Sequence, residues 1–194
     1  MSKKNERNTK GKIINAAWDL FYEQGYDDTT IEEIIHKSGT SKGSFYHYFE
    51  GKDALLGSLS YIFDEEYSRL QDILPADMSA FDKLLYLNKK LFAVIEERID
   101  IDLLTRLYST QLVTKGEKHF LDNKRIYYKL LRKIVAEGQQ SGELASDMTV
   151  NEIVKLYAMS ERALIYDWCL CNGEYSLSSY AKRIMPGYLS TIRS

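Results

Sequence analysis

A run of small polar and cationic residues, Thr40-Ser41-Lys42-Gly43-Ser44, comes just before an unusually aromatic segment that ends at Phe49. Ser41 is suited to cap a helix, so Lys42, Gly43 and Ser44 would occupy its first turn. That turn offers free backbone N–H groups, one cation and little side-chain bulk. A helix that meets DNA phosphates and base edges at close range needs this combination.

A second short helix must position this turn. Thr30 can be its N-cap, and Glu33 stands three residues later to complete a capping box. Gly39 suits the left-handed backbone position just past a helix end. Three isoleucines at helical spacing would form the buried face, namely Ile31, Ile34 and Ile35. The segment 30–49 therefore predicts a helix-turn-helix.

The aromatic end of this segment divides into core and surface. Phe45 and Phe49 share one helix face and are expected to pack toward the first helix, at about residues 9–24. Tyr46 and His47 fall on other faces, and their polar tips favour water or a phosphate. Lys52 begins the next helix, where the helix dipole disfavours a cation unless a phosphate lies nearby.

Helical periodicity runs through the rest of the chain and predicts an all-α protein of about nine helices, with no convincing strand. The expected helices span about 9–24, 30–49 (the helix-turn-helix), 52–74, 79–98, 100–113, 118–140, 149 onward and 176–185. We expect residues 1–51 to form a three-helix DNA-binding domain. Residues 52–194 would form a larger helical domain for ligand binding and dimerisation.

Composition restricts the class of protein. The 194 residues are 44% hydrophobic and 28% charged, which is ordinary for a globular protein. The formal net charge of -2 does not indicate a nucleic-acid binder, but five basic residues stand within the first twelve, Lys3, Lys4, Arg7, Lys10 and Lys12. They fit either a disordered arm that follows DNA or a solvated terminus. Without a membrane-length apolar run or a signal-peptide core, we expect a cytoplasmic protein.

Catalytic and metal-binding patterns are missing from the sequence. It contains no glycine-rich phosphate loop, no nucleophile elbow and no histidine pair at helical spacing. Cys169 and Cys171 are two residues apart on an expected helix, so their side chains should diverge and stay reduced. We therefore expect no enzyme activity, no cofactor and no metal.

The segment 25–56, GYDDTTIEEIIHKSGTSKGSFYHYFEGKDALL, closely resembles the DNA-binding signature of the tetracycline-repressor (TetR/AcrR) family of bacterial regulators. The matching features are the Gly-aromatic pair, the double Thr, the Ser-Lys-Gly triplet, Tyr46, Phe49 and the Lys52-Asp53 pair. Ile35, Ser38 and Phe45 depart from the usual pattern, but these are packing changes.

The resemblance implies a homodimer whose two heads read a pseudo-palindromic operator in successive major grooves, about 34–36 Å apart. It also implies roles for single residues. Thr30 would bind a phosphate, while Thr40, Ser41 and Lys42 would hold the backbone and base edges. Gly43 would permit close approach, and Ser44 would discriminate bases. Tyr46, His47 and Lys52 would anchor the flanking phosphates.

For the second domain the resemblance implies a small-molecule effector and a dimer interface made by the last two long helices. Aromatic walls with a few polar groups suit an effector site, so the candidates are Phe92, Tyr108, Tyr127, Tyr157 and Glu161. Glu161 interrupts an apolar stripe and must be paired, face a wet cavity or an interface, or lie at a solvent edge. Its charge would favour a cationic effector.

The leading hypothesis is a transcriptional repressor that a ligand releases from its operator. Two alternatives stay open at this point. One is an architectural DNA-binding protein without a ligand, and the other is a helical binding protein or enzyme with a vestigial head.

Overall fold

The computed structural model describes residues 3–113, 115 and 118–194. Within these ranges the chain forms ten α-helices and two short 3-10 helices, which confirms the predicted all-α class. The chain divides into two compact units, residues 1–59 and 60–194. None of the described helices is both long and apolar enough to cross a membrane.

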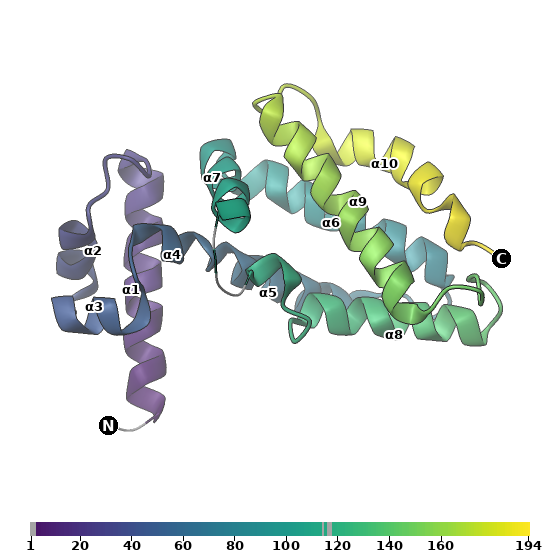
Figure 1. Cartoon of the computed structure of the whole chain (residues 1–194), viewed down its shortest axis with the longest axis horizontal. Helices are drawn as coiled ribbons and strands as arrows, with labels where there is room; N and C mark the ends of the chain where they lie inside the picture. The colour runs from purple at the N-terminus through teal and green to yellow at the C-terminus, as the bar shows by residue number, and fades with distance from the viewer. Residues whose placement is uncertain (1–2, 114, 116–117) are drawn as a thin grey trace. The chain divides into compact units, whose positions relative to one another are not determined.

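The first unit holds the helix-turn-helix, made by α2 (Ile31–Ser38) and α3 (Lys42–Tyr48), which pack against α1 (Lys3–Gln24) (Figure 1). Thr30 and Glu33 form the predicted capping box, and Gly39 is left-handed with φ 61°. Phe45 and Phe49 are buried as expected. The described helix α1 begins at Lys3, earlier than the expected start at about residue 9, so the segment with the five basic residues is helical and, of the two alternatives, the disordered arm is excluded.

The expected helix over 52–74 is interrupted, which explains ten helices instead of nine. It consists of α4 (Lys52–Leu56) and α5 (Leu59–Ile73), separated by Gly57 and Ser58. The Ser58 hydroxyl donates to the Leu55 carbonyl over 2.5 Å and accepts the indole N–H of Trp18 over 2.7 Å. Apolar spacing continues across this two-residue break, so periodicity could not reveal it.

The second unit contains α6 (Ala80–Arg98), α7 (Ile101–Val113), α8 (Ile126–Gln140), α9 (Val150–Leu170) and α10 (Leu177–Tyr188). Helix α10 packs along α6, while α9 packs against α7, α8 and α10 (Figure 1). Gly138 of α8 lies against the N-terminal end of α6, where an added Cβ would come within 2.5 Å of the Ala80 Cβ. This close approach requires glycine.

Two predicted boundaries of this unit are confirmed and one is wrong. Ser79 caps α6, and Thr149 with Glu152 forms a capping box on α9. The helix expected over 118–140 instead starts at Ile126, after the short helix η1 (His119–Leu121). The Asp122 carboxylate accepts the Lys124 N–H over 2.9 Å, and this local turn competes with a helix. A second 3-10 helix, η2 (Ser190–Ile192), follows α10.

Candidate functional site

The first turn of α3 presents its backbone donors and its cation at the surface. Ser41 is the N-cap, and its hydroxyl oxygen accepts the Ser44 N–H over 3.1 Å and lies 2.9 Å from the Ser44 hydroxyl. Lys42 and Gly43 are exposed, and Ser44 is half-buried. The Lys42 ammonium lies 3.7 Å from the Glu32 carboxylate, but both side chains are about 70% exposed, at 69% and 71%. Such a pair contributes little and can open for a phosphate.

Packing within the first unit does not explain why residue 43 is glycine. A Cβ built on it would meet only the Ser41 hydroxyl, at 3.9 Å, and its backbone is helical. Glycine destabilises a helix relative to alanine by roughly 0.5–1 kcal/mol. Nothing among the described residues compensates for this cost, which is what a requirement for close DNA approach would produce.

The two threonines of the expected interface are already hydrogen-bonded. The Thr30 hydroxyl donates to the Glu33 carboxylate over 2.8 Å, and the Thr30 N–H reaches the same oxygen over 2.8 Å. The Thr40 hydroxyl lies 2.8 Å from the Ser38 hydroxyl. A phosphate at Thr30 would therefore have to displace Glu33 from the hydroxyl.

Tyr46 and His47 lie on the exposed side of α3, whereas Phe45 and Phe49 are buried. Tyr46 is 49% exposed, whereas Phe45 is fully buried. His47 is exposed and its ring packs edge-on against Tyr48, with the centroids 4.7 Å apart. Both polar tips are thus available to a partner on the surface of the head.

Lys52 is placed differently from what a phosphate anchor requires. Its ammonium donates to the carbonyl oxygens of Tyr26 (2.6 Å), Asp27 (3.3 Å) and Thr29 (2.8 Å), and it lies 4.3 Å from the Tyr26 ring centroid. The Tyr26 hydroxyl in turn donates to the Asp53 carboxylate. An ammonium has three donors, so a phosphate would have to compete with three carbonyls for Lys52. This position favours a role in holding the loop before α2.

The second unit contains a cavity of about 50 Å³ with mostly aromatic and aliphatic walls. Its lining consists of Phe63, Tyr67, Leu91, Ile95, Tyr108, Phe120, Arg125, Tyr127, Ala158, Glu161, Arg162 and Ile165. Three of the five candidate ligand residues, Tyr108, Tyr127 and Glu161, are therefore brought together. The other two are not.

Phe92 and Tyr157 are absent from the cavity lining because they belong to the packed core. Both are fully buried. The Tyr157 hydroxyl donates to the Leu84 carbonyl over 2.9 Å, which fastens α9 to α6. Their aromatic character could not distinguish a wall residue from a core residue, and here it is explained by packing.

Glu161 is paired inside the protein and is only 3% exposed, so the solvent-edge alternative is wrong. Its carboxylate accepts the Tyr127 hydroxyl over 2.8 Å, the Asn88 amide over 3.0 Å and, more weakly, the Tyr67 hydroxyl over 3.4 Å. Burial raises the pKa of Glu161, and the Asn88 and Tyr127 donors and the Arg162 charge oppose the rise. Burial and the Glu161 charge also raise the pKa of Tyr127 well above its ordinary value.

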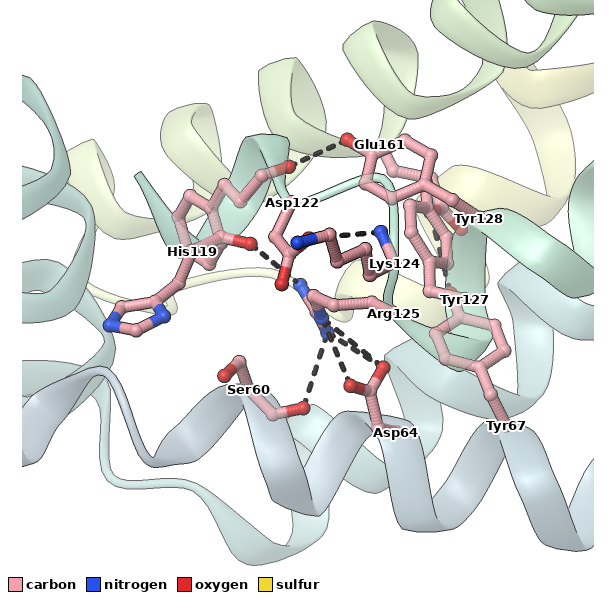
Figure 2. Close-up of polar contacts among 11 residues, drawn as sticks. Ser60, Asp64, Tyr67, His119, Asp122, Lys124, Arg125, Tyr127, Tyr128 and Glu161 are labelled. Atoms are coloured by element: carbon pink, nitrogen blue, oxygen red, sulfur yellow. Dashed lines mark hydrogen bonds and ion pairs between the residues drawn. The ribbon is translucent and has the colours of Figure 1, made fainter. Parts of the chain in front are cut away.

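Arg125, which the sequence did not single out, ties one wall of the cavity to α5 (Figure 2). Its guanidinium contacts both carboxylate oxygens of Asp64, at 3.1 and 3.2 Å, and donates to the Ser60 carbonyl over 3.2 Å. The two charged side chains are only 10% and 15% exposed. The sequence signal was weak, because an arginine just before a helix resembles many surface cations.

Two open grooves flank the cavity, and Arg162 lines all three spaces. One groove, of about 720 Å³, runs between α8 and α9 and is also lined by Arg132 and Lys155. The other, of about 690 Å³, is lined by residues of α7 and α9 together with Phe120. Arg162 and Arg125 also face the same cavity as Glu161. These charges weaken the expected preference for a cationic effector.

Comparison with known families accounts for most of the chain. A family model described as bacterial regulatory proteins of the tetR family matches residues 13–59. A second model, described as the C-terminal region of YsiA-like protein, matches residues 63–189.

Individual relatives are distant but cover nearly the full length. The fatty acid metabolism regulator protein of Bacillus subtilis strain 168 is 23% identical over 187 residues, which span 94% of this chain and 95% of that protein. The crystal structure of FadR from Bacillus subtilis with stearoyl-CoA has a TM-score of 0.70 at 22% identity and covers 95% of this chain and 100% of that one. The structure of Thermus thermophilus FadR, a transcriptional repressor, with lauroyl-CoA has a TM-score of 0.75 at 20% identity, with 93% of each chain covered.

Proposed function

The chain belongs to the TetR family of DNA-binding transcriptional regulators, and we propose that it is a homodimeric repressor that a long-chain acyl-CoA releases from its operator. The family assignment establishes a regulator rather than an enzyme. The observation that supports an effector of this kind is the aromatic cavity of α5 to α9, which opens beside a groove rich in cations.

The DNA-binding surface in this proposal is the exposed side of α3 with the N-terminus of α2. Lys42, the α3 backbone donors and the tips of Tyr46 and His47 contact phosphates, and Ser44 contacts a base edge. Gly43 allows the helix backbone to approach. The phosphate contacts supply affinity that falls steeply with salt, while the base contacts select the sequence.

A second copy of the chain is expected against α9 and α10. Helix α9 exposes an apolar stripe at helical spacing, with Met159 51% exposed, Tyr166 49% and Leu170 64%. Large exposed apolar side chains in one line are typical of an interface. Two copies related by a two-fold axis would cover this stripe with itself and present two heads to a pseudo-palindromic operator. A DNA operator as the partner implies action in the cytoplasm.

Long-chain acyl-CoA is proposed as the effector because two solved relatives hold stearoyl-CoA and lauroyl-CoA and because the lining chemistry of this chain suits such a molecule. Its apolar tail matches the phenyl and aliphatic walls of the cavity. Arg162 at the wall, which is in none of the described ion pairs, matches an anion better than a cation.

The cavity must enlarge to accept a tail. At about 50 Å³ it holds a few waters, whereas ligand sites measure roughly 300–1,000 Å³. Tyr108 and Phe120, whose rings pack 4.7 Å apart, separate the cavity from the groove along α7. Displacing this pair would join the two spaces. An effector that binds only the enlarged form shifts the population toward it, which is the requirement for a signal.

Gel shift with fragments of the source genome, followed by titration with acyl-CoAs of increasing chain length, tests this function. We expect one or a few fragments to be retarded and long-chain acyl-CoAs to release them at lower concentration than short-chain ones. Retention of every fragment up to saturating acyl-CoA would contradict the proposed effector. Absence of any retarded fragment would contradict DNA binding itself.

A further inference from the structure

We propose that the groove between α8 and α9 binds the phosphate groups of the effector, with Arg132, Lys155 and Arg162 as the anion ligands. This inference rests on the proposed acyl-CoA response. It assigns a binding site to the phosphate-bearing part of the effector, which the apolar cavity cannot bind. The ligand chemistry is a phosphate ester carried on an amphipathic molecule.

The three cations converge because of their places on two packed helices. Lys155 and Arg162 are seven residues apart on α9, which is about two turns, so they lie on the same face. Arg132 lies across the groove on α8, one turn after Tyr128. The described lining of the groove contains these three cations and no carboxylate.

Each guanidinium is held by one contact and keeps further donors. Arg132 donates to the Asn123 carbonyl over 2.8 Å, and Arg162 reaches the Tyr128 hydroxyl over 3.4 Å. A guanidinium carries five N–H donors in a fork that matches phosphate. Within the described part of the chain no ion pair to a carboxylate involves Arg132, Lys155 or Arg162. Three like charges in one groove repel one another until an anion joins them.

The groove and the cavity are adjacent, because Ala158 and Arg162 line both. Ala158 is only 1% exposed, so its small side chain is the partition between the two spaces. A ligand with phosphates at Arg132 and Lys155 would therefore direct its apolar tail past Ala158 and toward Tyr127 when the cavity enlarges. Asn123 and Asn151 add exposed amides to the groove, suited to the polar linker of such a head.

The test compares the full-length protein with the double variant R132A/K155A. Arg162 is left intact because it also lines the cavity. The matched control is K133A, which removes an exposed cation of α8 that is absent from the groove lining. Isothermal titration at low and high salt would use three probes, namely lauroyl-CoA, free coenzyme A and lauroyl-N-acetylcysteamine. The last of these keeps the tail and thioester but carries no phosphate.

We expect the double variant to bind lauroyl-CoA at least tenfold more weakly than wild type and to lose most of the salt dependence. Its affinity for lauroyl-N-acetylcysteamine and the behaviour of K133A should be unchanged. Equal affinity of wild type and double variant for lauroyl-CoA would overturn the phosphate site and leave the effector proposal standing. An equal loss for both lauroyl ligands would also overturn it.

If wild type does not bind lauroyl-CoA, the effector proposal fails. The titration with free coenzyme A then tests whether the groove binds phosphate groups. Binding of coenzyme A that R132A/K155A abolishes and K133A retains would support the phosphate site. Absence of coenzyme A binding would overturn both proposals.

Discussion

The Arg125 guanidinium contacts both oxygens of the Asp64 carboxylate, at 3.1 and 3.2 Å, and so joins the wall of the cavity to the first turns of α5. The same guanidinium donates to the Ser60 carbonyl over 3.2 Å and to the His119 carbonyl over 3.4 Å. Four oxygen atoms, from Asp64, Ser60 and His119, thus meet at one cation. Any ligand that enters the cavity meets this cation as part of the wall.

Removing the Asp64 charge should destabilise the protein strongly. In D64N the Arg125 charge stays nearly buried without its partner, and breaking such a pair costs about 3–5 kcal/mol when burial is complete. With side chains 10% and 15% exposed, we expect a loss of about 2–4 kcal/mol in the free energy of unfolding. Urea denaturation measures it. E32Q, which removes the carboxylate charge from the exposed Lys42–Glu32 pair, with side chains 69% and 71% exposed, serves as the control and should cost less than about 1 kcal/mol. Comparable losses in both variants would refute the special role of Arg125.

Gly43→Ala should change stability and DNA affinity in opposite directions. The added Cβ meets only Ser41 at 3.9 Å, so the isolated protein should gain up to about 0.5–1 kcal/mol from helix propensity. Operator affinity should fall because the methyl group lies where the DNA backbone approaches. Thermal unfolding and fluorescence anisotropy with the operator report the two effects. Unchanged operator affinity would mean that Gly43 does not approach DNA.

Lys42 and Lys52 should respond differently to truncation. Lys42→Ala should weaken operator binding by at least ~1 kcal/mol and reduce the slope of log affinity against log salt by about one, with little change in stability. Lys52→Ala removes three donors from the loop before α2 and should cost about 1.5–3 kcal/mol of stability. A salt titration of operator binding together with urea denaturation separates the two. If K52A were as stable as wild type but its operator binding depended less on salt, Lys52 would be a phosphate contact after all.

Glu161 should make stability depend on pH. Its pKa in the folded state is raised above the ordinary value of 4.5, so the fold favours the neutral acid. The corresponding stabilisation is present below that value and is lost as pH rises through the folded pKa. The difference in melting temperature between wild type and E161Q should therefore fall from about pH 4 toward pH 8. A difference that stays constant across this range would show that Glu161 has no raised pKa.

A charge on the apolar stripe of α9 should disrupt the proposed dimer. Tyr166 is 49% exposed, so Y166D costs little in the free chain but buries a carboxylate between two copies. We expect sedimentation to show a shift toward monomer and the operator affinity to fall sharply. The control is D167N, a substitution at the exposed residue next to Tyr166. A Y166D variant that remains dimeric would exclude this stripe from the interface.

The head was predictable because its local signals agree. Thr30 with Glu33, Gly39 and Ser41 each specify a cap, and all three caps are confirmed. The cavity was only partly predictable from the sequence. A buried tyrosine has the same sequence pattern whether it lines a cavity, like Tyr127, or donates to a carbonyl in the core, like Tyr157. Glu161 was detectable because a carboxylate interrupts an apolar stripe, while Arg125 was not, because its partner Asp64 lies far away in sequence. Contacts between distant segments have no periodic signal.

In the proposed function, the small volume of the cavity would determine how much effector the protein needs. Because the walls must separate before a tail enters, the open form is a minor fraction of the free protein, and the apparent dissociation constant is the intrinsic one divided by that fraction. The Tyr108–Phe120 contact would thus set the effector concentration at which the regulator leaves DNA. Trimming either ring would lower that concentration, and the regulator would respond to effector concentrations that the native protein ignores.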